Sequence, residues 1–358
     1  MDLFETSALE QGTGQPIHHE GFVVMSHSAR LRHPALLPVL AVVTVLAAVA
    51  SLMVGPVAID PARLWAAATG HGDYVATAIL FDLRLPRAVL GLAVGAMLGL
   101  AGAALQGYLR NPLAEPSVLG ASNTAALGAV GAIYFGLAEL HILLLPALAI
   151  LGGVFALLAL SALAGRSESP LTLILAGIAI STLAIAGVSL ALNLSPNPFA
   201  AMEIMTWLLG SIENRSIDHV WIALPCIALG VALLLMDARA LDALSLGEEG
   251  AQTLGVDLRR VRLRLLLGVG IGVGGAVAVS GSIGFIGLIV PHLVRPLTDR
   301  SPSAVLLPSL VAGAALLTLA DIAVRLIPTS SELKLGVVTA FLGVPVFLVH
   351  LLRERRLW

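Results

Sequence analysis

Long apolar runs, separated by short segments rich in polar residues, proline or glycine, follow one another from residue 35 to the C-terminus. A helix of about 20 apolar residues crosses the hydrocarbon core of a bilayer. The runs do not alternate between apolar and polar residues, which favours helices over barrel strands. We predict an all-α polytopic membrane protein with about ten transmembrane helices over residues 34–358. The predicted spans lie near 35–54, 87–109, 117–136, 141–163, 171–193, 219–237, 259–280, 283–297, 304–327 and 335–352.

Two segments fall outside these runs. Residues 1–33 are polar, with no apolar stretch long enough for a signal peptide, and we expect a disordered cytoplasmic N-terminal tail; Met25 is an equally suitable start. Between the fifth and sixth spans, Ser195–Pro198 interrupts the helix, because proline cannot continue the backbone hydrogen bonds. The next residues, Phe199–Leu209, suit a short helix at the outer surface or an ordinary structured loop equally well.

Composition and charge agree with a chain that lives in lipid. Apolar residues make up 58% of the 358 residues and charged residues only 12%, whereas about a quarter of the residues of a soluble domain are charged. With both termini placed in the cytoplasm, fourteen of the 20 Arg and Lys residues lie on the inner side. Positively charged connections stay inside, so we expect both termini in the cytoplasm and an even number of spans.

Small residues recur at intervals of four in the second and seventh spans. Gly91, Gly95 and Gly99 share one face of the second span, and Gly268 and Gly272 begin a similar face in the seventh. Such faces let two helix backbones approach closely inside a membrane. We therefore predict close helix packing at both faces.

The connection between the sixth and seventh spans predicts a short helix at the inner surface, about 245–255. Its residues form a capping-box pattern, Ser first and Glu three positions later, followed by apolar positions and a terminal glycine that suits the left-handed conformation. The residues concerned are Ser245, Leu246, Glu248, Glu249, Ala251, Leu254 and Gly255. Inner-leaflet lipid attracts basic helices, so an acidic helix fits a protein partner better. From these residues alone, a partner and a plain connector remain equally supported.

Several kinds of chemistry are excluded by the residues available. Lys334 is the only lysine, and it does not lie in the Gly-rich loop that binds nucleotide phosphates, so any ATP hydrolysis belongs to another chain. The nine histidines are scattered without ligand spacing, and His292 reads as a packed or capping residue. We expect a transport protein rather than an enzyme, with no cofactor or metal bound by this chain and no nucleic acid partner.

Ionisable residues inside predicted spans are few, and Asp321 and Arg325 are the clearest pair. They lie four apart on the ninth span, so they can form an ion pair along one helix face. Arg325 also lies near the outer end, as do Arg84 and Arg87 of the second span. We expect these arginines to form an exposed positive patch that steers an acidic partner.

Four longer motifs resemble the permease family of iron-siderophore, haem and cobalamin ABC importers. The likeness runs from about residue 35 to the C-terminus and leaves out the first 33 residues. The motifs are Arg84–Arg87 (RLPR), Gln106–Gly120 (QGYLRNPLAEPSVLG), Gly281–Arg295 (GSIGFIGLIVPHLVR) and Gly336–Pro345 (GVVTAFLGVP).

The resemblance implies a ten-helix permease that works as a homodimer, or with a like permease subunit, by alternating access. Two cytoplasmic ATPases would carry ATP and Mg²⁺, and a periplasmic or lipid-anchored binding protein would deliver the substrate. The family places a coupling helix in the ATPase, here Ser245 to Gly255, and outer arginines against glutamates of the binding protein, here Arg84 and Arg325. The expected location is the cytoplasmic (inner) membrane of a prokaryote.

One departure bears on the substrate. Cobalamin permeases carry small polar residues at a cytoplasmic gate before the fifth span, where this chain has Ser167, Ser169, Pro170 and Leu171. Proline and leucine near the gate positions disfavour cobalamin, so an iron chelate is preferred. The alternative function is an ion-coupled secondary transporter, which places acidic residues near mid-membrane, and Asp321 is its candidate. A membrane-embedded enzyme lacks a catalytic cluster within the spans.

Overall fold

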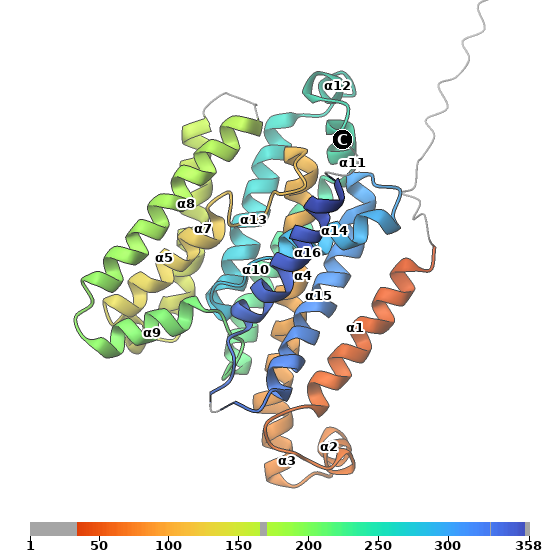
Figure 1. The fold of residues 1–358 in the computed structure, drawn as a ribbon. Coiled ribbons are helices and arrows are strands. Elements are labelled where there is room, and N and C mark those ends of the chain that lie inside the picture. Colours follow the sequence, from red (N-terminus) through yellow and green to blue (C-terminus); the bar gives the residue numbers. More distant parts are fainter. Residues whose placement is uncertain (1–33, 165–169, 330, 355–358) are drawn as a thin grey trace, which may run out of the picture.

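The computed structural model describes residues 34–164, 170–329 and 331–354, and this part of the chain is helical (Figure 1). The long helices are joined by short connecting helices, several of which begin at a capping Asp or Asn. The helices are α1 (Leu36–Met53), α2 (Pro61–Ala68), α3 (Tyr74–Ala78), α4 (Leu85–Leu109), α5 (Ala121–Tyr134), α6 (Leu137–Leu140), α7 (Leu144–Ala164), α8 (Pro170–Asn193), α9 (Pro198–Leu208), α10 (Ile217–Met236), α11 (Ala238–Leu244), α12 (Glu248–Thr253), α13 (Leu258–Ser280), α14 (Ile286–Val294), α15 (Pro302–Leu326) and α16 (Leu335–Glu354).

Each of the ten predicted spans contains one of these helices, and no strand occurs in the described residues. Seven helical segments are long and apolar enough to cross a membrane by length and composition; α14, with the short 3-10 turn that follows it, and α16 are shorter apolar helices. The fold class is therefore confirmed. α5 and α14 begin later than predicted, because Gly120 and Phe285 adopt left-handed conformations that break the helix just before each one starts.

The second span extends well beyond its predicted start. α3, a π-helical segment at Ile79–Arg84 and α4 form one continuous helix from Tyr74 to Leu109, 36 residues long. Pro86 has no backbone N–H, so the regular α-helical ladder cannot pass through it. The wider π turn lies directly before this proline. The extension carries α4 out to α2 at one end of the molecule (Figure 1).

The core is built around α4, which packs most extensively on α15 and also contacts α10, α13 and α14. The predicted small-residue face of α4 is confirmed. A Cβ atom added at Gly95 would lie 2.3 Å from the carbonyl oxygen of Gly313 in α15, and one added at Gly99 would lie 2.4 Å from that of Ser309. In the seventh span, α13, Gly272 likewise meets Gly230 of α10. The backbones touch because no side chain separates them.

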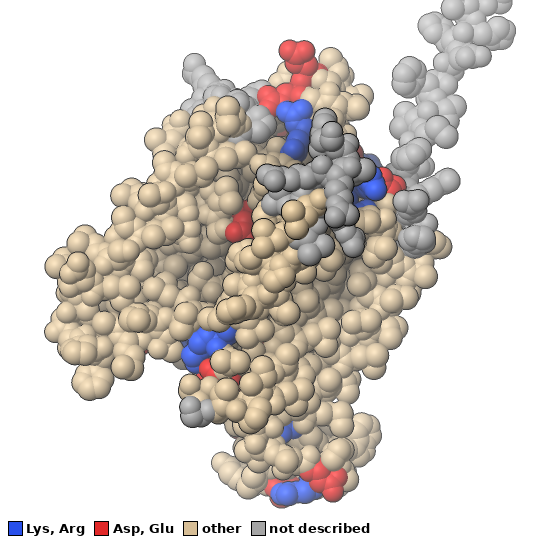
Figure 2. Space-filling view, viewed as in Figure 1, with Lys and Arg blue, Asp and Glu red and all other residues tan. Residues whose placement is uncertain are grey.

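The bundle has two distinct ends (Figure 1). We call them the α12 end, which also holds the start of α1 and the end of α16, and the α9 end, which holds α2, α3 and α9. The helix predicted at Phe199–Leu209 is present as α9 and lies across the α9 end of α5, α7 and α8. On the face shown in Figure 2, charged side chains gather mainly at the two ends. The chain begins and finishes its helical part at the same end, as an even number of spans requires.

Candidate functional site

The predicted inner helix exists as α12, but it begins differently. Ser245 does not cap it: its hydroxyl donates to the carbonyl of Asp242, 2.6 Å away, and the residue ends α11. The capping-box prediction is therefore wrong. Gly247, with φ of +95°, stands at the start of α12, and Gly255, with φ of +83°, follows it as predicted. Ser245 lies between two helices, and its hydrogen bond to Asp242 ties it to the end of α11.

Two leucines that flank α12 form an apolar surface that the rest of the described chain leaves uncovered. The Leu246 side chain is 70% exposed and Leu254 is 64% exposed, whereas Ala251 is fully buried in the main core. Glu249 is exposed in the first turn, where the helix dipole favours an acidic residue. The expected apolar contacts of both leucines are therefore not made within the described residues, and the buried Ala251 packs α12 on the core.

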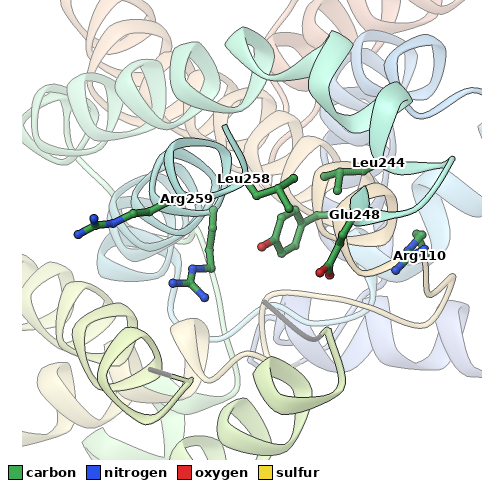
Figure 3. Close-up of a pocket in the computed structure, with 7 residues that line it drawn as sticks. Arg110, Leu244, Glu248, Leu258 and Arg259 are labelled. Carbon is green, nitrogen blue, oxygen red and sulfur yellow. The ribbon is translucent and has the colours of Figure 1, made fainter. Parts of the chain in front are cut away.

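Glu248, the first residue of α12, lines a small pocket of about 10 Å³ (Figure 3). Its side chain lies between Leu258 and Arg110, with Leu244 on the side of α11. The full lining is Tyr108, Arg110, Leu244, Glu248, Leu258, Arg259 and Arg262. The pocket has room for no more than about one water, which is too little for a ligand. Its lining residues instead join α12 to the ends of α4 and α13.

At the α9 end, four ionised side chains from α4, α15 and the segment before α16 form a buried cluster. Arg87 donates through Nη2 to Asp321 Oδ1 at 2.7 Å and through Nε to the same carboxylate at 3.0 and 3.1 Å. Arg325 Nη2 lies 2.8 Å from Asp321 Oδ2, which confirms the predicted pair along one helix. Glu332 makes a further ion pair with Arg87. Asp321 and Arg325 side chains are each only 2% exposed.

Arg84 and Arg325 are buried, so the expectation of an exposed positive patch is wrong. Arg84 donates to the carbonyls of Leu52 and Met53 at 2.9 Å, and Arg325 donates to those of Ser51 and Val54 at 2.9 and 2.7 Å. The last carbonyls of a helix have no partner within it, and these two guanidinium groups supply the missing donors at the end of α1. The predicted contact with a binding protein remains a prediction.

The structure describes only part of the predicted cytoplasmic gate. Ser167 and Ser169 lie outside the described residues, α8 begins at Pro170, and the side chain of Leu171 is 64% exposed. In the part of the chain that the structure describes, no group of three or more His, Cys, Asp or Glu residues could hold a metal ion.

Sequence reasoning missed two cavities at the α9 end. The larger, about 450 Å³, lies between α9, the connection from α9 to α10 and the start of α16. The smaller, about 140 Å³, lies between that connection and the ion cluster. Glu213, Asn214 and Arg215 line both. The signal was the polar triplet of Glu213, Asn214 and Arg215 in the connection from α9 to α10. Only the fold brings Lys334 beside it, with Nζ 3.0 Å from Glu213 Oε2.

Comparisons with known proteins give the same assignment along most of the chain. The FecCD transport family matches residues 43–353. The Fe(3+) dicitrate transport system permease protein FecD of Escherichia coli is 39% identical over 286 residues, covering 80% of this chain and 88% of that protein. The vitamin B12 import system permease protein BtuC of Citrobacter koseri is 36% identical over 338 residues, covering 94% of this chain and all of that protein.

A solved structure, described as an inward-facing conformation of a metal-chelate type ABC transporter, superposes with a TM-score of 0.81 and 32% identity. The superposition covers 90% of this chain and all of the solved chain. The matched range spans α4, α12, the ion cluster and both cavities, so every feature of the site falls inside it. The relatives are named as transport permeases, not enzymes. On its motifs, its helical architecture and these similarities, the chain belongs to the FecCD transport family of ABC importer permeases.

Proposed function

We propose that this permease carries an iron chelate across the inner membrane of a prokaryote by alternating access, with the α12 end in the cytoplasm. It would pair with a second copy or a like subunit, with two ATPases below and a binding protein above. The exposed apolar surface of α12 is the observation that carries the proposal. A surface of this kind at the end of a bundle marks a protein contact, and the chain has no phosphate-binding loop of its own.

The contacts of α12 suit a coupling element. Ala251 anchors α12 in the main core, and α12 packs on both α11 and α13. α11 in turn reaches the start of α15, where the amide of Ser303 donates to Asp242 Oδ1 at 2.8 Å. A displacement of α12 by an ATPase would therefore reach α13 and α15, two of the long helices that pack on α4.

An iron chelate is preferred as cargo for two reasons. The dicitrate permease is among the relatives, and Pro170 and Leu171 at the start of α8 stand near the gate positions where cobalamin permeases carry small polar residues. For the binding protein, the α9 end is the docking face. Arg84 and Arg325 hold the end of α1, so they would meet its carboxylates only after the Ser51–Val57 stretch releases them.

The rival function, ion-coupled secondary transport, requires a carboxylate that can exchange its ion. Asp321 is held by Arg87 and Arg325 and is 1% exposed. The two arginines already occupy both carboxylate oxygens, which favours a structural role. The family assignment also favours the ABC importer over this rival.

Replacing the two exposed leucines that flank α12 by aspartate, Leu246→Asp with Leu254→Asp, is expected to abolish co-purification of the ATPase encoded beside this chain. Both side chains are solvent-exposed, so the permease itself should fold normally, whereas a protein interface would have to bury two unpaired charges. The measurement is the ATPase recovered per tagged permease after affinity and size-exclusion chromatography in detergent.

Trp65→Asp is the matched control, because it makes the same kind of change at a 72% exposed apolar residue of α2, at the opposite end. It should leave ATPase recovery unchanged. Full ATPase recovery by the double variant would show that α12 is not the contact. Absence of any ATPase from the wild-type complex would instead count against the importer as a whole.

A further inference from the structure

Arg215 lies between the two cavities of the α9 end and lines both. It directly precedes the Ser216 cap of α10, so its backbone is fixed by the start of a long helix. Figure 2 shows basic and acidic side chains gathered near this end of α16. The larger cavity, at about 450 Å³, falls within the range of small-molecule sites in proteins.

The charge of Arg215 is not neutralised within the described chain. It makes no ion pair there, and its partly buried Nε has no hydrogen-bond acceptor. The nearest acidic residue in the sequence, Glu213, is already paired with Lys334. Burial lowers the pKa of the Arg215 guanidinium, yet arginine remains charged in proteins. A partly buried cation without a partner is costly, so this position favours an anion.

The rest of the larger cavity suits an organic ligand with an anionic group. Phe199, Met202 and Trp207 provide apolar and aromatic lining, beside the polar residues Glu203, Thr206, Ser211 and Asn214. Within the described residues, the buried Trp207 Nε1 is a second donor without a partner. Apolar and aromatic side chains beside a few polar groups are the usual chemistry of a small-molecule site. A planar guanidinium binds a carboxylate through two parallel hydrogen bonds.

We propose that Arg215 and the larger cavity form an outer binding site for the carboxylate of an anionic metal chelate. This inference rests on the proposed function and narrows its substrate class to chelates that carry a negative charge. Arg215 supplies the charge-assisted hydrogen bonds, and Phe199, Met202 and Trp207 cover the carbon framework. The lining also holds Glu203 and the Glu213–Lys334 pair, so Arg215 is the cation of this cavity that has no ion-pair partner in the described chain.

Equilibrium binding of ⁵⁵Fe-labelled ferric dicitrate to the purified full-length permease in detergent is the direct test. Arg215→Ala is expected to weaken binding by about tenfold or more, because a charge-assisted hydrogen bond is lost. Arg215→Lys, which keeps the charge but not the fork, should weaken it less. Arg63→Ala is the control, since Arg63 is an exposed arginine of the same end, paired with Asp73 outside both cavities. It should bind like the wild type.

A cationic chelate, ⁵⁵Fe-labelled ferrioxamine B, separates charge recognition from general damage. Its binding should not be weakened by Arg215→Ala. The proposal is overturned if folded Arg215→Ala binds ferric dicitrate like the wild type, or if it loses both chelates equally. It is also overturned if only capture of the binding protein is lost, since Arg215 would then be a docking residue.

ATP-driven uptake by proteoliposomes containing the whole importer distinguishes the two proposals. With the wild type, uptake of ferric dicitrate and a KM raised about tenfold in Arg215→Ala would support both. Uptake with an unchanged KM would overturn the anion site and leave the importer standing. If no chelate is transported, the chelate-importer proposal fails, and the binding measurement alone decides whether Arg215 forms an anion site.

Discussion

Replacing Asp321 by alanine is expected to destabilise the folded permease by about 3–5 kcal/mol, the usual cost of removing one partner from a buried ion pair. Asp321 is the shared partner of Arg87 and Arg325, and all three side chains are largely withdrawn from solvent. Glu332 still balances Arg87 after the substitution. Arg325 would keep only neutral acceptors, namely the backbone carbonyls of residues 51, 54 and 321 and the Ser51 hydroxyl.

Thermal unfolding of the detergent-solubilised protein, followed by loss of the monodisperse size-exclusion peak, measures this effect. Arg63→Ala is the matched control because it breaks an ion pair whose side chains are 56% and 46% exposed. Exposed pairs contribute about 0–1 kcal/mol, so this variant should melt close to the wild type. Adding Arg325→Met to Asp321→Ala should recover part of the loss, since the orphaned charge is removed with it. Equal melting of Asp321→Ala and wild type would show that the cluster does not hold α4 and α15 together.

The long helices could be predicted because lipid constrains both their length and their composition. The expected spans 35–54 and 259–280 agree with α1 at Leu36–Met53 and α13 at Leu258–Ser280 to within one residue. The short helices α2 and α3 were missed, since a search for apolar runs passes over polar connections. Their signal was nevertheless present: Asp60 and Asp73 each cap a helix by accepting a backbone N–H.

The site was harder to predict, because its contacts join residues that are far apart in the sequence. Arg87 and Asp321 are 234 positions apart, and Glu213 and Lys334 are 121 apart. A sequence places an arginine at the end of a span but does not show which carbonyls it will meet. That is why Arg84 and Arg325 were expected on the surface although they close the end of α1. The Ser245 pattern failed similarly, because its hydroxyl serves the preceding helix.

Gly102→Ala is expected to destabilise the protein by about 1–3 kcal/mol or more, the cost of overpacking a close-packed interior. Gly102 lies on the face of α4 that meets α14. A Cβ atom there would lie 1.8 Å from the carbonyl oxygen of Gly287 and 2.6 Å from its Cα. The obstacle is backbone rather than a flexible side chain, so α4 and α14 must separate before the methyl group fits.

Gly131→Ala makes the same chemical change inside α5, at a position where a Cβ atom meets nothing within 4 Å. Alanine in a helix interior is more stable than glycine by about 0.5–1 kcal/mol, so this variant should melt at or above the wild-type temperature. The two substitutions are therefore expected to shift the melting temperature in opposite directions. If Gly102→Ala also melts at or above the wild type, α4 and α14 must be free to move apart. The contact between Gly102 and Gly287 would then not hold α14, which lies within the Gly281–Arg295 motif, against α4.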